Sequence, residues 1–410
     1  MNQLVIVGAS LAGLRAAQAA RAAGFDGELI VIGDEPHLPY TRPPLSKELL
    51  TGDQTPEQCQ LTPAHLHVDW RLGVTATGLD RARRRVRLAG GEAIAYDRLI
   101  VATGCRARPW PGPGADLAGV HTLRGIDDAL AFRAALVPGT RLVIVGAGFI
   151  GCEVAASARG LGARVAVVDI ASHPMLPFGL ELGGRCADMH RAHGVDVHCG
   201  TGIRAITGTD RVQAVELTDG GRVAADVVLL ALGALPNSEW LAAAGLSLGP
   251  GLVCDATLTA IGDPDILAAG DVAAWPHPLA DGATVRVEHW TVAAEHGQLA
   301  GRNALLEPDQ RAAHVTPPYF WSDQYDTKIQ AVGFPGRAER LEIVEQSPEG
   351  DRLVAIGGRA GRLVSAVAFN AARRLTWYRR RLIDAPELDD VRDEVAADPA
   401  ALGAPVGAAA

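Results

Sequence analysis

Two segments of the chain share one pattern of apolar and small residues. Val5–Gly13 reads VIVGASLAG, and Val143–Gly151 reads VIVGAGFIG. Each continues into an Ala-rich stretch with helical spacing and then into a second apolar run, which ends at Asp34 in the first case and at Asp169 in the second. The pattern predicts a strand, a glycine-rich turn, a helix and a second strand at both places. Continuous apolar runs of this kind are typical of parallel strands that are buried on both faces.

Further along the chain, other apolar runs predict additional buried strands. RLIVATG (98–104) and VVLLALGALPN (227–237) each predict a buried strand that ends at a glycine. The segment RPWPGPG (108–114) predicts the boundary at which the chain leaves the first domain, and LPNSEW (235–240) predicts the point at which it returns to that domain. After Pro317 the pattern changes to short alternating segments and a final helix, which predicts an antiparallel sheet with a helix.

At 410 residues, the chain is long enough for two or three domains. The pattern predicts an α/β protein with two Rossmann-type dinucleotide-binding domains, the second inserted into the first, and a C-terminal α+β domain. The insertion is inferred from AAGD at Asp271, whose chemistry belongs with the first domain. The expected boundaries are 1–109 and 238–315 for the first domain, 110–237 for the second, 316–390 for the C-terminal domain, and 391–410 for a disordered tail.

The two glycine-rich turns predict sites for a pyrophosphate. Backbone N–H groups at a helix N-terminus point at the anion, and glycine permits its close approach. An acid at the end of the second strand accepts hydrogen bonds from ribose hydroxyls. The first turn departs from the pattern because a serine stands where the middle glycine is expected. The first site offers Gly8, Ser10, Gly13 and Asp34, and the second offers Gly146, Gly148, Gly151 and Asp169.

The second site predicts a preference for NADH over NADPH. Asp169 would repel a 2′-phosphate, and the next residues, Ile170, Ala171 and Ser172, provide no arginine to bind it. A net charge of −9 argues against general nucleic-acid binding. No apolar run approaches the roughly 20 residues that span a membrane, and the strand signal begins at Leu4, where a signal peptide would have to lie. We therefore expect a cytoplasmic protein.

The positive charge is concentrated in two groups of arginines, and Lys47 and Lys328 are the only lysines. Either group fits a solvated face or a docking patch for an acidic partner. One group is Arg81, Arg83, Arg84, Arg85 and Arg87; the other is Arg373, Arg374, Arg379, Arg380 and Arg381.

The six cysteines are scattered, with no C-x-x-C or C-x-x-x-x-C spacing. The spacing therefore indicates neither a redox-active disulfide nor a zinc site. The histidines are also scattered, and we expect no metal ligand among them.

Four longer motifs give the chain a specific resemblance. DEPHLPYTRPPLSKELL (34–50), AAGDVA (268–273), VEHW (287–290) and FWSDQYDTKIQ (320–330) resemble the FAD-dependent, NADH-dependent ferredoxin reductases. Those enzymes serve bacterial ring-hydroxylating dioxygenases and cytochrome P-450 monooxygenases, and they are similar to rubredoxin reductases and apoptosis-inducing factor. The resemblance covers residues 3–385. It implies the glutathione-reductase-like fold, with FAD and NADH as cofactors and a [2Fe–2S] ferredoxin as partner.

The resemblance also implies roles for individual residues. Lys47, Glu153 and Trp321 would lie where the nicotinamide meets the flavin. We expect Lys47 and Glu153 to come from different domains and to form an ion pair there, because a charge left alone in a partly dry pocket is costly. The implied FAD contacts are Gly8, Ser10, Ala12, Gly13, Asp34, Arg42, Lys47, Val74 (through its backbone), Arg124, Asp271 and Trp290. The implied NADH contacts are Gly146, Gly148, Gly151, Glu153, Asp169, Gly233 and Glu288.

Two nucleotide sites in one chain indicate hydride transfer between cofactors. Relatives of glutathione reductase pass electrons to a cysteine pair, but RPPLSK has a lysine where a thiol would be needed. We therefore expect electrons to leave one at a time to a separate iron–sulfur protein, since this chain has no Cys₄ cluster.

Two other classes of function stay open at this point. One is an NADH oxidase, peroxidase or quinone reductase of the same fold. A peroxidase would need a reactive cysteine near the flavin, and the sequence places none there. The other is a redox-sensing flavoprotein, which would call for basic surfaces and a targeting segment. The sequence leaves the oligomeric state open.

Overall fold

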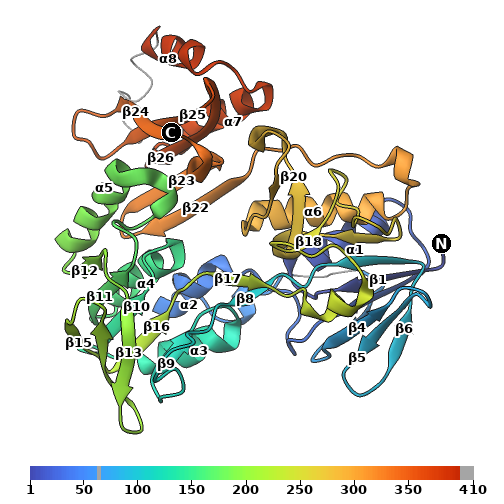
Figure 1. Cartoon of the computed structure of the whole chain (residues 1–410), viewed down its shortest axis with the longest axis horizontal. Helices are drawn as coiled ribbons and strands as arrows, with labels where there is room; N and C mark the ends of the chain where they lie inside the picture. The colour runs from blue at the N-terminus through green and yellow to red at the C-terminus, as the bar shows by residue number, and fades with distance from the viewer. Residues whose placement is uncertain (62–65, 398–410) are drawn as a thin grey trace. The chain divides into compact units, whose positions relative to one another are not determined.

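The computed structural model describes residues 1–61 and 66–397 and divides the chain into two compact units (Figure 1). The first unit contains Met1–Thr41, Cys59–Arg106 and Leu235–Phe320. The second unit contains Arg42–Gln58, Ala107–Ala234 and the described chain from Trp321 onward. The fold class predicted from the sequence is confirmed, because each unit contains a parallel sheet of the expected kind.

The first unit is built on a five-stranded parallel sheet. Its strand order is β19-β7-β1-β2-β3, so the two strands predicted from the first motif, β1 and β2, are neighbours. The apolar run of β1 is buried on both faces, and Leu4, Val5 and Ile6 have no exposed surface. The strands are β1 (Gln3–Val7), β2 (Glu28–Ile32), β3 (Asp69–Arg71), β7 (Arg98–Val101) and β19 (Ile266–Ala268).

Helices α1 (Leu11–Ala22) and α6 (Trp290–Asn303) pack against each other at backbone distance. A Cβ atom at Gly297 would lie 2.3 Å from the carbonyl oxygen of Ala12, and one at Gly301 would lie 2.3 Å from that of Ala16. The two glycines are four residues apart and therefore lie on one face of α6. Any larger residue at either position would push the helices apart.

The remaining strands of the first unit form two small three-stranded sheets. They are β4 (Ala76–Asp80), β5 (Arg85–Leu88) and β6 (Ala93–Ala95), and β18 (Leu252–Val253), β20 (Ala273–Pro276) and β21 (Thr284–Val285).

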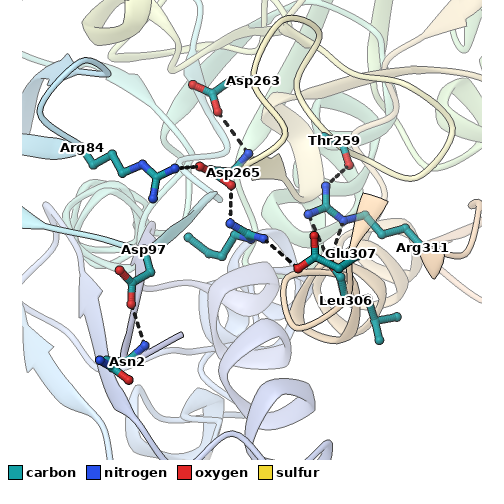
Figure 2. A network of polar contacts seen from close by, with 10 residues as sticks. Asn2, Arg84, Asp97, Thr259, Asp263, Asp265, Leu306, Glu307 and Arg311 are labelled. Carbon is teal, nitrogen blue, oxygen red and sulfur yellow. Dashed lines mark hydrogen bonds and ion pairs between the residues drawn. The ribbon is translucent and has the colours of Figure 1, made fainter. Parts of the chain in front are cut away.

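A network of ion pairs ties the first of these small sheets to the loop before β19. Arg84 and Arg98 both pair with Asp265 (Figure 2). The Arg81 Nε atom lies 2.8 Å from Asp263. Arg83 and Arg87 share the carboxylate of Asp80 in a similar way. Most of the first arginine group is thus engaged within the chain, which argues against that group as a docking patch.

The second unit contains the second parallel sheet, in the order β12-β11-β10-β16-β9. Helices α2 (Glu48–Thr51), α3 (Ile126–Ala135), α4 (Phe149–Gly160) and α5 (Gly179–Ala192) belong to this unit. The sheet strands are β9 (Val120–Thr122), β10 (Arg141–Val145), β11 (Arg164–Asp169), β12 (Asp196–Cys199) and β16 (Val227–Leu230). A further antiparallel sheet contains β13 (Ile203–Gly208), β14 (Val212–Leu217) and β15 (Arg222–Ala224).

The C-terminal part is a five-stranded sheet in the order β22-β23-β26-β25-β24, followed by helices α7 (Ala372–Arg381) and α8 (Leu388–Ala397). The expected tail from residue 391 is wrong for residues 391–397, which are helical. Val391 and Val395 are buried, and their spacing of four puts them on one face of α8. Residues 398–410 of the expected tail lie outside the described residues. The strands are β22 (Tyr319–Gln324), β23 (Thr327–Gly333), β24 (Arg340–Gln346), β25 (Leu353–Arg359) and β26 (Arg362–Phe369).

Short elements connect these parts. The chain crosses between the units within β8 (Cys105–Ala107) and β17 (Ala234–Pro236). Among the residues that the structure describes, no helix combines the length and apolarity needed to cross a bilayer. The 3₁₀ helices are η1 (Pro43–Ser46), η2 (Glu57–Cys59), η3 (Leu176–Phe178), η4 (Glu239–Ala244), η5 (Gly270–Val272), η6 (Pro278–Ala280), η7 (Pro308–Gln310), η8 (Pro335–Arg337) and η9 (Leu382–Asp384).

The core of the first unit contains three histidines grouped around Trp275. The ring centroids of Trp275 and His296 are 4.3 Å apart, and those of His296 and His314 are 4.4 Å apart. His277 donates through Nε2 to the carbonyl oxygen of Thr316 at 3.1 Å. Burial lowers the pKa of His277 to about 4 and that of His296 well below its usual value. Within the described residues, neither ring nitrogen of His296 has a hydrogen-bond partner.

These histidines predict that the first unit loses stability in mild acid. In the unfolded chain they take up protons below about pH 6.5, whereas the folded chain keeps His277 and His296 neutral. Their contribution is therefore complete above that pH and falls by about 4 kcal/mol for the pair between pH 8 and pH 5. The variant His296→Leu should lose about half of this dependence, because it removes one proton uptake and no hydrogen bond. Urea unfolding at several pH values measures it, and equal pH slopes for the variant and the wild type would contradict it.

Candidate dinucleotide-binding sites

The first and third glycines of each turn are required by the chain itself. In the first turn, Gly8 has φ +126°, and a Cβ there would lie 2.0 Å from the carbonyl oxygen of Ala102. A Cβ at Gly13 would lie 1.9 Å from the carbonyl oxygen of Gly8. The second turn repeats this arrangement, with Gly146 at φ +111° and a Cβ at Gly151 2.0 Å from the carbonyl oxygen of Gly146.

The middle glycine of the second turn is different. A Cβ built on Gly148 meets no atom of the described chain within 4 Å, so the described residues leave room for a Cβ atom there. Gly148 immediately precedes α4, whose first-turn N–H groups are unsatisfied by the helix itself. This open position fits a pyrophosphate at the helix N-terminus. Ser10 holds the equivalent position immediately before α1 in the first turn.

Asp169 lies at the end of β11 and also holds the second turn in place. Its Oδ2 accepts from the Ala147 N–H at 2.5 Å, and its Oδ1 accepts from the Ala171 N–H at 2.7 Å. Each carboxylate oxygen can accept a further hydrogen bond, so the geometry fits a ribose diol as well. The structural role in the turn was not predicted from the sequence.

The other residues expected near the two turns lie at the carboxyl ends of the sheets. Asp34 is exposed just beyond β2. The N–H of Val74 donates to the carbonyl oxygen of Gly33 at 2.8 Å, which places Val74 next to Asp34. Gly233 follows β16, the neighbour of β10, and has φ +84°. Parallel α/β sheets bind their ligands at this edge.

Ala12 is a packing junction in the first unit. Its carbonyl oxygen faces Gly297, and its Cβ would lie 3.0 Å from a Cβ at Gly270, which has φ +75°. The turn that carries Asp271 and the helix that begins at Trp290 therefore both pack on the start of α1. Trp290 itself packs against the core cluster that contains Ala12. The structure thus brings three of the expected FAD residues of the first unit, Ala12, Asp271 and Trp290, into one neighbourhood.

Arg42 and Arg124 are brought together in the second unit. Arg42 Nη1 donates to the carbonyl oxygen of Arg124 at 2.7 Å. Asp128 Oδ2 accepts from the N–H groups of Arg124 and Gly125, which fixes the start of α3.

The expected ion pair between Lys47 and Glu153 is present. Lys47 Nζ lies 3.1 Å from Glu153 Oε1, and the two side chains are only 11% and 4% exposed. The Ser46 hydroxyl donates to Glu153 Oε2 at 2.6 Å, and the Ser157 hydroxyl donates to the carbonyl oxygen of Ser46 at 2.7 Å. The expectation that the partners belong to different domains is wrong at the level of these units, because both lie in the second unit. Ser46 and Ser157 were missed from the sequence, although Ser46 lies within the RPPLSK motif.

Asp271 and Glu288 are connected through an arginine that the sequence did not single out. Arg286 Nη1 donates to the carbonyl oxygen of Asp271 at 3.1 Å, and Arg286 Nη2 lies 2.6 Å from Glu288 Oε1. The Cys105 thiol donates to Asp271 Oδ2 at 3.2 Å. This contact between Cys105 and Asp271 was not predicted from the sequence.

Trp321 lies in the second unit, on β22. The end of this strand is held to α5, because His190 Nε2 bonds Gln324 Oε1 at 3.0 Å and His190 Nδ1 bonds the Tyr325 hydroxyl at 3.1 Å. Gln324 in turn donates to the hydroxyl of Ser322, the residue after Trp321.

The remaining cysteines and acids form no further reactive centre in the part of the chain that the structure describes. No cluster of three metal-ligating side chains occurs there, and Cys152, Cys186, Cys199 and Cys254 carry free thiols. Burial raises the pKa of Cys186 to about 12 and that of Cys152 well above its usual value. These thiols are therefore poor nucleophiles.

The second arginine group is only partly available for docking. Arg374 pairs with Glu345 at 2.7 Å, Arg381 pairs with Glu394, and both guanidinium groups lie over Trp377. Arg373 and Arg380 are exposed on α7. A docking role for this group would therefore depend mainly on these two.

Comparison with known proteins agrees with this geometry. The pyridine nucleotide-disulphide oxidoreductase family matches residues 2–297, and a reductase C-terminal family matches residues 319–402. The chain is 37% identical over 400 residues to the ferredoxin–NAD(+) reductase component of the biphenyl dioxygenase system of Paraburkholderia xenovorans, which covers 95% of this chain and 97% of that protein.

Two solved structures are similar over nearly the whole chain. The covalent complex of putidaredoxin reductase with putidaredoxin aligns with a TM-score of 0.90 at 29% identity, covering 97% of this chain and 99% of that one. The ferredoxin reductase of the CYP199A2 system of Rhodopseudomonas palustris aligns with a TM-score of 0.89 at 32% identity, covering 97% and 100%.

The fold and the two glycine-rich turns define a protein with two dinucleotide-binding domains of Rossmann type and a C-terminal α+β part. The chain belongs to the pyridine nucleotide-disulphide oxidoreductase family.

The buried pair predicts energetic coupling between Lys47 and Glu153. Removing either partner leaves the other charge uncompensated, so Lys47→Ala and Glu153→Ala should each lower the free energy of unfolding by about 2–3 kcal/mol. The double variant should lose less than the sum of the two, by about 1–3 kcal/mol. Urea-induced unfolding of the four proteins measures the coupling. The exposed pair Arg141 and Asp226 is the matched control, for which the same cycle should give less than about 1 kcal/mol. Strictly additive losses at Lys47 and Glu153 would exclude the coupling.

Proposed function

We propose that the protein is an FAD-dependent NADH:ferredoxin oxidoreductase. It would pass electrons from NADH through FAD to a [2Fe–2S] ferredoxin that serves a ring-hydroxylating dioxygenase or a cytochrome P-450 monooxygenase. The observation that carries the proposal is the presence of two dinucleotide turns in one chain that has no cysteine pair at C-x-x-C or C-x-x-x-x-C spacing. The relatives support it, since they are named as ferredoxin reductase components of oxygenase systems.

The first unit would hold the adenosine diphosphate part of FAD. Gly8, Ser10 and Gly13 would receive the pyrophosphate, Asp34 the ribose, and Asp271 the ribityl chain. The resemblance also assigns FAD contacts to Val74 and Trp290, which belong to the first unit, and to Arg42 and Arg124, which belong to the second. Ala12 would act through packing, because it supports the start of α1 and the Asp271 turn.

The second unit would hold NADH. Gly146, Gly148 and Gly151 would receive its pyrophosphate and Asp169 its ribose, with Gly233 at the same edge of the sheet. The resemblance also assigns contacts at the nicotinamide end to Glu153 and Trp321, which belong to the second unit, and to Glu288, which belongs to the first. Bound flavin supplies the chemistry that accepts a hydride and releases electrons singly. Lys47 would hold the Glu153 carboxylate in place until the nicotinamide carboxamide arrives.

The acceptor would be a separate protein, because the sequence has no C-x-x-C or C-x-x-x-x-C pair to which a flavin could pass electrons. A cytoplasmic location belongs to the same proposal and is supported by the free thiols of Cys152, Cys186, Cys199 and Cys254, since a reducing compartment keeps cysteines reduced.

We expect the purified protein to bind FAD without a covalent link and to reduce a [2Fe–2S] ferredoxin with NADH. Reduction of the ferredoxin, followed by its visible absorbance, should be at least about tenfold faster than reduction of oxygen or a quinone under the same conditions. This reflects direct electron transfer to a docked protein. Faster turnover with oxygen or quinone would assign the chain to the oxidases or quinone reductases instead. Redox-dependent binding of a partner without turnover would indicate a redox sensor.

The Asp169 carboxylate predicts a preference for NADH of at least about tenfold in kcat/KM, which corresponds to about 1.4 kcal/mol. Asp169→Asn removes the charge and keeps an acceptor for only one of the two N–H groups that Asp169 binds, so it should narrow the preference for NADH. Asp34→Asn is the matched control in the first turn and should leave the ratio unchanged. Equal kcat/KM for NADH and NADPH in the wild type would overturn this assignment.

A further inference from the structure

Asp271 is held through its side chain and through its backbone within the first unit. Its carboxylate Oδ2 accepts from the Cys105 thiol at 3.2 Å, and its main-chain carbonyl oxygen accepts from Arg286, which pairs with Glu288. Asp271 and Cys105 are 8% and 5% exposed. A charged side chain buried to this extent needs donors that fix its position as well as its charge.

The fold brings the thiol and the carboxylate together through two neighbouring strands. Cys105 follows β7 after Gly104, and Asp271 follows β19. These strands are parallel neighbours, with Val101 in register with Ala268. Their carboxyl ends therefore lie at one edge of the sheet, where parallel α/β sheets bind their ligands. The glycine turn after β1 lies at the same edge, because β1 is the other neighbour of β7.

We propose that Cys105 is a positioning residue for the flavin cofactor, acting through Asp271. The inference rests on the proposed function, in which Asp271 bonds the ribityl chain of FAD. The hydrogen bond from the thiol holds the Asp271 side chain in one rotamer, so that the carboxylate is already oriented when FAD binds. This preorganisation increases affinity because less conformational freedom is lost on binding.

The chemistry of this position makes a graded test possible. A thiol is a weak donor, a hydroxyl is a stronger one, and a methyl group donates nothing. Cys105→Ala should therefore weaken FAD binding about fivefold, because one hydrogen bond to a charged acceptor is lost. Cys105→Ser should restore it to within about twofold of the wild type.

The test uses the protein stripped of flavin and titrated with FAD, with flavin fluorescence as the readout and the rate of FAD release as a second measurement. Cys254→Ala is the matched control. Cys254 is also buried in the first unit, at 2% exposed, and its thiol donates to a backbone carbonyl oxygen, that of Leu252, at 3.4 Å. Its replacement should leave the affinity for FAD unchanged.

The outcomes separate this inference from the proposed function. Weaker binding in Cys105→Ala, with recovery in Cys105→Ser and no change in Cys254→Ala, supports it. Equal affinities for FAD in the wild type and in Cys105→Ala would overturn the inference while leaving the FAD site intact. An equal loss of affinity in Cys254→Ala would also overturn it, because the effect would then be one of packing in general. A wild-type protein that binds no FAD would instead reject the proposed function.

Discussion

The close approach of α1 to α6 is the constraint on which the first dinucleotide site depends. Gly297 and Gly301 allow the backbone of α6 to approach that of α1 at Ala12 and Ala16. Gly270 allows the turn that carries Asp271 to pack on Ala12 as well. Because the glycine-rich turn leads into α1 and the Asp271 turn packs on it, this contact fixes the spacing between a phosphate-binding backbone and a buried carboxylate. One added methyl group at Gly297 would disturb both at once.

In the second site, neighbouring backbone atoms occupy the space next to the first and third glycines of the turn, and the space next to the middle glycine is open. Gly146 and Gly151 are closed by neighbouring carbonyl oxygens, whereas Gly148 faces no atom of the described chain within contact distance. The acid at Asp169 holds the turn rigid through two backbone N–H groups. Nearby in the same unit, a buried lysine and glutamate neutralise each other. The second unit thus combines a rigid turn for an anion with a buried ion pair, whose glutamate also accepts a hydrogen bond from Ser46.

Local features were predicted well from the sequence, and long-range ones were not. The strand, turn, helix and strand around each glycine motif are confirmed, because they depend on residues within about thirty positions of one another. The contact between Cys105 and Asp271 joins residues 166 positions apart, and only the pairing of β7 with β19 creates it. In the same way, the role of the first arginine group in ion pairs could not be predicted from composition, since its partners Asp263 and Asp265 lie in a loop that is distant in the sequence. The helix at 388–397 was missed because only two of its residues, Val391 and Val395, are buried in an otherwise acidic stretch.

The order in which the chain contributes to its two units has a consequence for how it folds. The units alternate along the sequence, so each is assembled from three separate segments. During synthesis the sheet of the first unit lacks its edge strand until residue 268 is made, and α1 lacks its partner until α6 follows. Closing such long loops before any packing is gained slows folding and leaves apolar strands exposed in the meantime. Neither unit can therefore be released as an independently folding fragment by a single cut in the chain.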